Sequence, residues 1–313
     1  MHDFKIATGR SNPELANRVA NILGIDLSET TIQNFSDGEI WVKFEDNVRG
    51  IDLFIIQSTF PPSDNIFELL MLIDAAKRAS VKRVTAVIPY YGYSRQDRKD
   101  QPRVSITAKL VANLLERAGA DRVITIDLHS SQIQGFFDIP LDNLYASPVL
   151  IRAARKLGLE NIAVAAPDVG SVKTARAYAK RLENANLVIV DKRRPQHNVA
   201  EVMNVIGDPS NKHVFIVDDM IDTGTTFIKC AEALKDQGAL DIFGICVHPV
   251  LSGDAIDKLQ NADAVKNIFV TDTIPLKKKT DKFIVASVAE LLSEAIIRTH
   301  DNRSISSLFE IER

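Results

Sequence analysis

Short apolar segments alternate with longer segments of helical periodicity along most of the chain. The predicted strands are rich in Val, Ile, Leu, Phe and Ala and cover residues 4–8, 52–58, 84–90, 123–129, 162–168, 187–192, 214–219, 242–248 and 267–272. The predicted helices include residues 12–24, 65–80 and 106–120; in the last, a spacing near 3.6 relates Ile106, Leu110, Val111, Leu114 and Leu115. This alternation predicts parallel sheets with helices on both faces.

One segment interrupts the alternation. Residues 32–44, IQNFSDGEIWVKF, contain two short stretches of strand character around Asp37-Gly38. Because Asp-Gly is a favoured dipeptide of tight hairpin turns, we expect an antiparallel hairpin here.

The two halves of the chain have similar layouts. Residues 83–97 and 161–175 both contain a strand, a proline, a turn and a polar loop, and residues 108–130 loosely match 228–250. We therefore predict an α/β protein with two related domains, each a mainly parallel sheet flanked by helices. The predicted domains are residues 1–145 and 146–291. The sequence does not fix the parent domain of the tail, about 292–313, and its packing with the first domain is a hypothesis.

Composition narrows the class of protein. The 313 residues are 45% hydrophobic and 25% charged, and the formal net charge of −3 gives no reason to expect nucleic-acid binding. No apolar stretch approaches the ~18 residues that span a membrane, and the N-terminus lacks the pattern of a signal peptide. We interpret Cys230 and Cys246 as buried reduced thiols, rather than as a disulfide or as catalytic groups. We expect a cytoplasmic protein without membrane or nucleic-acid partners.

The strongest chemical motif is VDDMIDTGTTF, which joins the strand ending near residue 217 to a predicted helix. Backbone amides at a helix N-terminus favour phosphate, whereas carboxylates repel it. A single aspartate often only caps a helix, but capping needs one carboxylate and this motif has three. A sugar phosphate explains both features, because hydroxyls and amides hold the phosphate while carboxylates accept hydrogen bonds from the sugar.

Two further strand ends carry groups suited to a metal and to phosphates. His129 follows one strand, and Asp168 follows another and opens the small-residue loop DVGSVK. An imidazole and a carboxylate could hold a hydrated Mg²⁺ that also binds phosphates, although a single histidine is more often structural.

Cationic and aromatic groups occur in three other loops. Lys192, Arg193 and Arg194 end a strand; such cations are usually solvated, but near a phosphate they could neutralise developing charge. Phe35 offers a face for stacking, beside Asp37 and Glu39, which could accept from an exocyclic amine. The segment that holds Arg95, Arg98, Lys99 and Arg103 is basic and suits a polyphosphate.

Taken together, these segments resemble the ribose-phosphate pyrophosphokinase family over essentially the whole chain. FSDGE, VRG, YGYSRQDRK, DLHSSQIQGFF, APDVG and DDMIDTGTT occur in the family's order and spacing. DDMIDTG alone would also fit many phosphoribosyltransferases, so the specificity lies in the combination.

The resemblance implies two phosphoribosyltransferase-like domains and transfer of the diphosphoryl group of ATP to O1 of ribose 5-phosphate, with release of AMP, for nucleotide biosynthesis. It implies that ribose 5-phosphate is held by Asp218, Asp219, Asp222, Thr223, Gly224, Thr225 and Thr226. The implied ATP-binding residues are Phe35, Asp37, Glu39, Arg95, Gln96 and Asp97. The implied diphosphate loop is Asp168, Val169, Gly170 and Ser171, the Mg²⁺ ligands are His129 and Asp168, and the catalytic cations are Lys192 and Arg194.

The resemblance also implies a homohexamer, activation by phosphate and inhibition by ADP, with a regulatory site that includes Arg49, Ser304 and Ser306. Two positions depart from the family pattern, because Thr225 and Ser171 stand where glycine is usual. A β-branched residue at positive φ would be strained. A non-catalytic regulatory subunit therefore stays an alternative, and a phosphoribosyltransferase is the second enzymatic one.

Overall fold

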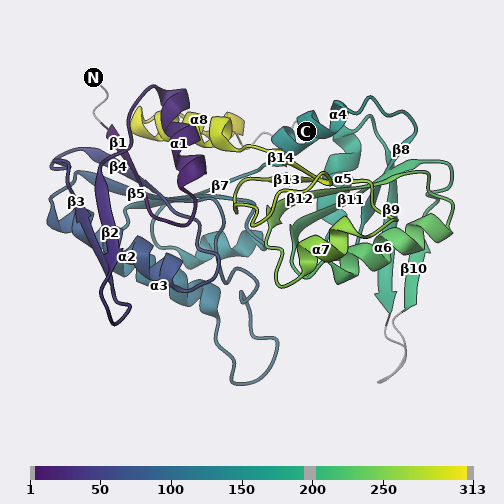
Figure 1. Cartoon of the computed structure of the whole chain (residues 1–313), viewed down its shortest axis with the longest axis horizontal. Coiled ribbons are helices and arrows are strands. Elements are labelled where there is room, and N and C mark those ends of the chain that lie inside the picture. Colours follow the sequence, from purple (N-terminus) through teal and green to yellow (C-terminus); the bar gives the residue numbers. More distant parts are fainter. Residues whose placement is uncertain (1–3, 194–201, 309–313) are drawn as a thin grey trace. The chain divides into compact units, whose positions relative to one another are not determined.

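The computed structural model describes residues 4–193 and 202–308, and its internal contacts divide the chain into two compact units (Figure 1). Unit 1 extends to Tyr145 and includes the segment from Val288 onward, whereas unit 2 is Ala146–Ser287. The C-terminal segment assigned to unit 1 thus begins slightly before the predicted tail at about residue 292. Both units have mainly parallel sheets flanked by helices, as the alternating pattern predicts.

Unit 1 is built on a parallel five-stranded sheet. The strand order is β1 (Phe4–Thr8), β4 (Asp52–Ile56), β5 (Arg83–Ile88), β6 (Arg122–Ile126) and β7 (Leu141–Leu144). Helices α2 (Asp64–Arg78) and α3 (Thr107–Ala118) cover one face, and α1 (Pro13–Leu23) and α8 (Ala289–His300) cover the other (Figure 1). A short 3₁₀ helix, Ser131–Phe136, follows β6, and another covers Ser306–Leu308.

Polar contacts join the C-terminal helix to the sheet of unit 1. Asp52, almost fully buried at the start of β4, accepts from Arg83 Nη2 at 2.5 Å and lies 2.9 Å from Nδ1 of His300. The ring of His300 also contacts Phe4, with 4.9 Å between ring centroids. These contacts explain why the segment after Val288 belongs to unit 1.

The predicted hairpin is confirmed. β2 (Thr30–Asn34) pairs antiparallel with β3 (Ile40–Phe44), and the turn contains Gly38 at a φ of 96°. Ile32, Val42 and Phe44 pack against the core that α2 contributes to. An isolated two-stranded hairpin is marginally stable in water, so this packing holds its base.

Unit 2 contains a seven-stranded sheet. Its order is β10 (Val202–Ile206), β9 (Asn186–Arg193), β8 (Ile162–Ala166), β11 (His213–Ile221), β12 (Ile242–Pro249), β13 (Asn267–Thr271) and β14 (Phe283–Ala286). Only the pair β9–β10 is antiparallel among these described strands. Its helices are α4 (Ser147–Arg155), α5 (Val172–Arg181), α6 (Thr225–Asp236) and α7 (Ala255–Gln260).

Some details differ from the sequence prediction. In α3, Val111 and Leu115 are buried, but Leu110 and Leu114 are 52% and 40% exposed. Cys230 and Cys246 are free and buried, as expected. In the part of the chain that the structure describes, no helix has both the length and the apolar character required to cross a bilayer.

Candidate functional site

The acidic motif lies at the carboxyl end of β11, where the strand passes through a tight turn into α6. Asp218 and Asp219 are in the strand and partly buried, whereas Thr223, Thr225 and Thr226 are exposed. Gly224 precedes the helix with a φ of 75° and has no side chain to cap the first turn. A bound anion can therefore interact with the first amides of α6.

Gly224 is also confined by packing. A Cβ at this position would lie 3.1 Å from Cγ and Cδ1 of Leu259 in α7. Both the positive φ and the close approach of α7 therefore require glycine here.

The two departures from the family pattern do not produce backbone strain. Thr225 is the first residue of α6 and is not among the described residues with positive φ. Ser171, directly before α5, has φ −82° and ψ −3°. Because both residues have conformations that ordinary L-residues adopt, the strain considered for them is absent.

The structure brings the predicted diphosphate loop to the acidic motif. β8 and β11 are parallel neighbours, so the loop after β8 and the carboxyl end of β11 share one edge of the sheet. Ser171 Oγ lies 3.2 Å from Oδ1 of Asp168 and 3.0 Å from Oδ1 of Asp218. The Ser171 amide also donates to Asp168 Oδ1 at 2.9 Å. A single hydroxyl thus joins two carboxylates that sequence analysis assigned to different ligands.

The electrostatics of this edge favour protons or cations. Burial and then the neighbouring carboxylates of Asp219 and Asp168 together raise the pKa of Asp218 to about 8, and the Ser171 hydrogen bond opposes the shift. Asp168 is exposed and Val169 is 68% exposed, so the diphosphate loop is open to ligands.

The proposed metal ligands are divided between the units. His129 is exposed after β6 in unit 1, and Asp168 is in unit 2. Within the described ranges, no group of three or more His, Cys, Asp or Glu side chains forms a ready-made metal cage. The chemistry available at the edge of unit 2 is carboxylate oxygen, which suits Mg²⁺ together with substrate phosphates.

The candidate ATP residues of unit 1 lie in two loops. Phe35, Asp37 and Glu39 form the exposed turn of the hairpin, where Phe35 is 50% exposed. The side chain of Asp37 accepts from the amide of Glu39 at 3.0 Å, which orders this turn. Arg95 and Asp97 lie in the loop after β5 with Gln96, whose Oε1 accepts from the hydroxyl of Thr107.

Two of the predicted cationic residues, Lys192 and Arg193, are the last residues of β9, in agreement with the strand expected there. Lys192 is in register with Met203 of β10, and Arg194 lies outside the described residues. The predicted regulatory residues are exposed: Arg49 lies between β3 and β4, and the hydroxyl of Ser304 donates to that of Ser306 at 3.0 Å.

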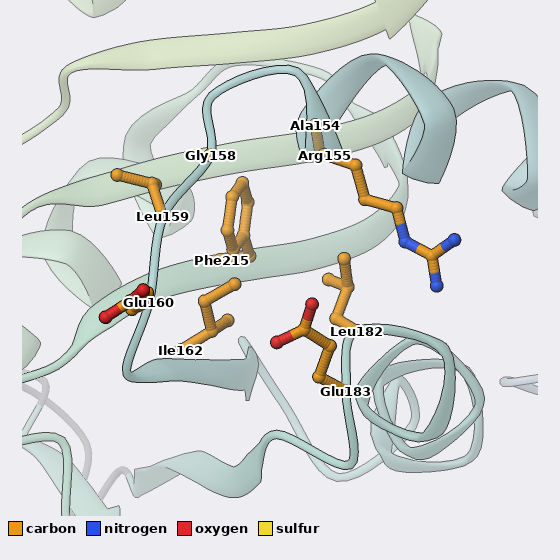
Figure 2. A pocket seen from close by; sticks show the side chains of 9 residues that line it. All are labelled: Ala154, Arg155, Gly158, Leu159, Glu160, Ile162, Leu182, Glu183 and Phe215. Atoms are coloured by element: carbon orange, nitrogen blue, oxygen red, sulfur yellow. The ribbon is translucent and has the colours of Figure 1, made fainter.

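A pocket of about 340 Å³ lies away from this chemistry (Figure 2). It is lined by Ala154, Arg155, Gly158, Leu159, Glu160, Ile162, Leu182, Glu183 and Phe215. Ile162 begins β8, whereas Asp168 follows its end. The pocket is therefore at the amino edge of the sheet and contains none of the predicted site residues.

Comparisons with known proteins agree along the chain. Residues 4–119 match the family model described as the N-terminal domain of ribose phosphate pyrophosphokinase, and residues 190–310 match the phosphoribosyl synthetase-associated domain. A ribose-phosphate pyrophosphokinase of Chlorobaculum tepidum is 54% identical over 98% of this chain and 95% of its own length. One of Wolinella succinogenes is 53% identical over 99% and 100%. The crystal structure of phosphoribosylpyrophosphate synthetase from Mycobacterium smegmatis superposes with a TM-score of 0.91 at 38% identity, covering 96% of this chain and 99% of the other.

Proposed function

The chain belongs to the ribose-phosphate pyrophosphokinase family, and from this premise we propose how its residues carry out the family reaction. The enzyme transfers the β,γ-diphosphoryl group of ATP to O1 of ribose 5-phosphate, giving 5-phospho-ribose 1-diphosphate and AMP. One observation carries the residue assignments: the Ser171 hydroxyl joins the diphosphate loop to the acidic motif at one sheet edge.

We assign ribose 5-phosphate to the carboxyl end of β11. Residues 223–226 and the first amides of α6 bind its phosphate, since the exposed hydroxyls and the helix N-terminus offer donors. Asp218 and Asp219 accept hydrogen bonds from the sugar hydroxyls. The transferred diphosphate then lies on residues 168–171; the 3.0 Å distance from Ser171 Oγ to Oδ1 of Asp218 supports this assignment.

We assign the adenine of ATP to the hairpin turn. The ring of Phe35 is exposed for stacking, and the carboxylates of Asp37 and Glu39 can accept from the exocyclic amine. Residues 95–97 supply further polar contacts on the ATP side. These groups would have no role in a phosphoribosyltransferase.

We propose that Asp168 holds Mg²⁺ in unit 2; His129, the other ligand that the family resemblance implies, belongs to unit 1. The carboxylates of Asp168 and Asp218 lie close enough to share one hydroxyl, and their mutual repulsion, which contributes to the raised pKa of Asp218, favours a divalent cation at this edge. When bound, the ion would neutralise charge on the phosphates. Activity should therefore require free Mg²⁺ beyond that complexed with ATP, and full activity at equimolar Mg²⁺ and ATP would contradict a protein-held ion.

The attack of a sugar hydroxyl on phosphorus depends on alignment and charge neutralisation more than on a strong base. We therefore assign transition-state stabilisation to Lys192 and Arg194. Lys192→Ala or Arg194→Ala should lower kcat by a factor on the order of 10² to 10³ with smaller effects on KM. Lys266→Ala is the matched control, because Lys266 pairs with Asp241 at the amino edge of the sheet. Large KM increases at unchanged kcat would instead make the two cations binding residues.

We further propose that the protein is a cytoplasmic homohexamer that serves nucleotide biosynthesis, and that it is activated by phosphate and inhibited by ADP. Phe67 of α2 and Leu110 and Leu114 of α3 are exposed on two helices that pack together, which supports a contact face between copies. Arg49, Ser304 and Ser306 are exposed and so accessible to an anionic effector. Sedimentation of the protein with and without phosphate would test the assembly.

We no longer retain the alternative of a non-catalytic regulatory subunit. It depended on strain at Thr225 and Ser171, and both have ordinary backbone angles.

A further inference from the structure

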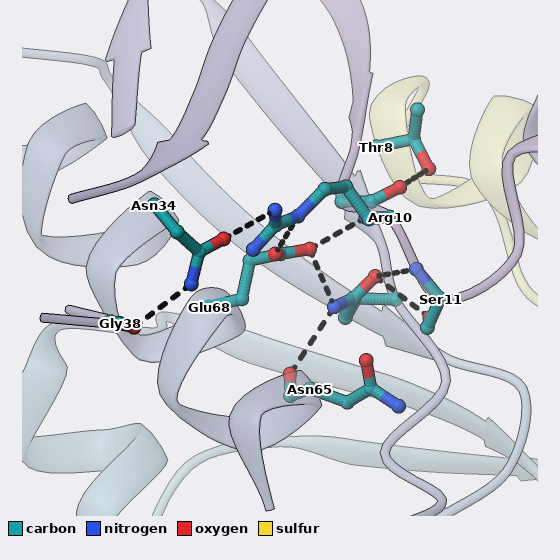
Figure 3. Close-up of polar contacts among 9 residues, drawn as sticks. Thr8, Arg10, Ser11, Asn34, Gly38, Asn65 and Glu68 are labelled. Atoms are coloured by element: carbon teal, nitrogen blue, oxygen red, sulfur yellow. Dashed lines mark hydrogen bonds and ion pairs between the residues drawn. The ribbon is translucent and has the colours of Figure 1, made fainter. Parts of the chain in front are cut away.

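A buried acidic residue in unit 1 is linked to the adenine-binding turn through an arginine (Figure 3). Glu68 of α2 is 2% exposed, and its carboxylate accepts from Gln57 Nε2 at 3.0 Å and from the Arg10 amide at 2.5 Å. Arg10 Nε completes the ion pair with Glu68 Oε2 at 2.6 Å. A buried carboxylate needs such partners, because unpaired it would be strongly destabilising.

The network is closely packed around the loop that carries Arg10, between β1 and α1. Gln57 is fully buried and accepts from the Ser11 hydroxyl at 2.7 Å. A Cβ on Gly9 would lie 2.4 Å from Gln57 Oε1 and 2.5 Å from Glu68 Oε1. The backbone of Arg10 is therefore fixed by its surroundings, even though its side chain is 44% exposed.

The guanidinium of Arg10 also contacts the hairpin, through Nη1. Arg10 Nη1 donates to Oδ1 of Asn34, the last residue of β2, at 2.7 Å. Asn34 Nδ2 in turn donates to the carbonyl of Gly38 in the turn at 2.8 Å. A continuous chain of hydrogen bonds thus connects buried Glu68 to the turn that holds Phe35.

The other hydrogen bonds of the turn are formed within the turn. Across the described residues, the other hydrogen bonds of residues 35–39 join Phe35 to Glu39, Gly38 to Phe35 and Glu39 to Asp37. All six residues from Asn34 to Glu39 are exposed. The hairpin is packed on α2 at its base, and among the described residues the Arg10–Asn34 bond joins the turn end of the hairpin to another part of unit 1.

We propose that Arg10 is a positioning residue for ATP, which holds the hairpin tip so that Phe35, Asp37 and Glu39 are already aligned when adenine arrives. This inference rests on the proposed adenine site. The guanidinium is suited to the role because Nε and Nη1 point to different partners in a fixed plane, whereas a lysine ammonium can satisfy Glu68 or Asn34 but not hold both in that geometry. Pre-alignment removes an ordering cost from binding.

The chain contains a built-in reporter for the tip. Trp41 is the single tryptophan, and it lies in β3 opposite Gln33, next to the pair Asn34–Ile40. Its fluorescence anisotropy in the ligand-free protein measures the mobility of the hairpin without any assay of activity.

Arg10→Lys, Asn34→Ala and the double variant form the test, because none leaves Glu68 without a cation. Arg78→Ala is the matched control, since Arg78 pairs with Asp74 on the exposed face of α2. We expect Arg10→Lys and Asn34→Ala to lower Trp41 anisotropy and to raise both the calorimetric Kd and the KM for ATP about 3- to 10-fold, because the first variant weakens the exposed Arg10–Asn34 bond and the second removes it together with the Asn34–Gly38 bond. The KM for ribose 5-phosphate should stay within about 2-fold, and the double variant should be no worse than the more affected single variant.

Phe35→Ala distinguishes failure of the positioning role of Arg10 from failure of the proposed adenine site. If it weakens ATP while Arg10→Lys and Asn34→Ala do not, the positioning role is wrong and the adenine site stands. If none of the three changes ATP binding, adenine binds elsewhere and both ideas are wrong. Unchanged anisotropy in Arg10→Lys and Asn34→Ala, or fully additive losses, would also overturn the inference.

Discussion

Replacing Thr225 by glycine restores the residue that the family usually has at this position, and the structure predicts that the change weakens ribose 5-phosphate. If binding of ribose 5-phosphate forced Thr225 to positive φ, glycine would relieve about 1–2 kcal/mol in the complex and tighten binding about 5- to 30-fold. Thr225 instead begins α6 and is not among the described positive-φ residues, so there is no such strain to relieve.

The expected magnitude follows from what the variant loses. Glycine in the first turn costs a few tenths of a kcal/mol relative to threonine. Loss of the exposed Thr225 hydroxyl removes one of the proposed hydrogen bonds to the phosphate, a net contribution of about 0.5–1.5 kcal/mol. Together these predict a Kd for ribose 5-phosphate that rises about 3- to 20-fold.

Calorimetric titration with ribose 5-phosphate in the presence of Mg²⁺ shows directly whether Thr225→Gly raises or lowers the Kd. Thr225→Ser keeps the hydroxyl and should bind nearly as the parent does. Gly224→Ala is the positive control for strain: it places Cβ at φ 75° and 3.1 Å from two carbon atoms of Leu259, so it should lower the free energy of unfolding by at least about 1–2 kcal/mol. Tighter binding by Thr225→Gly would refute the conformation assigned to this loop.

Other predictions concern the same unit. Asp219→Ala should weaken ribose 5-phosphate about 10- to 150-fold and reduce discrimination against 2-deoxyribose 5-phosphate, whereas Thr226→Val should weaken both sugars equally; equal losses in both variants would contradict this division. Without Mg²⁺, the raised pKa of Asp218 makes ionisation of this carboxyl unfavourable in the folded state. The free energy of unfolding should therefore fall as the pH rises from 3.8, the pKa of Asp in the unfolded chain, to about 8, by at most about 1.4 kcal/mol per pH unit. Asp218→Asn should flatten that slope in denaturant titrations, and an unchanged slope would assign it to another group. Burial raises the pKa of both Cys230 and Cys246, so a thiol reagent at pH 8 should label them only after unfolding, and rapid native labelling would show that this core opens.

Periodicity predicted the sheet-and-helix alternation because the central strands are continuous apolar segments and the turns carry specific residues. Asp37-Gly38 located the hairpin for that reason. Of the missed strands, β7 and β14 have only four residues each, and in β10, VMNVI, the polar Asn204 interrupts the apolar run. Leu110 and Leu114 match the helical period and yet are exposed, because the period identifies a possible apolar face but not the neighbour that would cover it.

The candidate site was predictable as motifs but not as contacts. The motifs predict a ligand chemistry for each loop, and sheet topology then implies that the loops after β8 and β11 meet at one edge. The Ser171 hydroxyl between Asp168 and Asp218, and the Arg10–Asn34 bond, depend on side chains 47 and 24 positions apart in the sequence. Such pairs are set by packing, which no local pattern contains.

The most direct test of the reaction follows both products of one incubation with ATP, Mg²⁺ and ribose 5-phosphate. Phosphorus NMR should show AMP and a diphosphate on C1 of ribose 5-phosphate forming in a one-to-one ratio, with no signal when the sugar phosphate is omitted. Formation of ADP or free pyrophosphate in place of AMP and the sugar diphosphate would contradict diphosphoryl transfer by this chain.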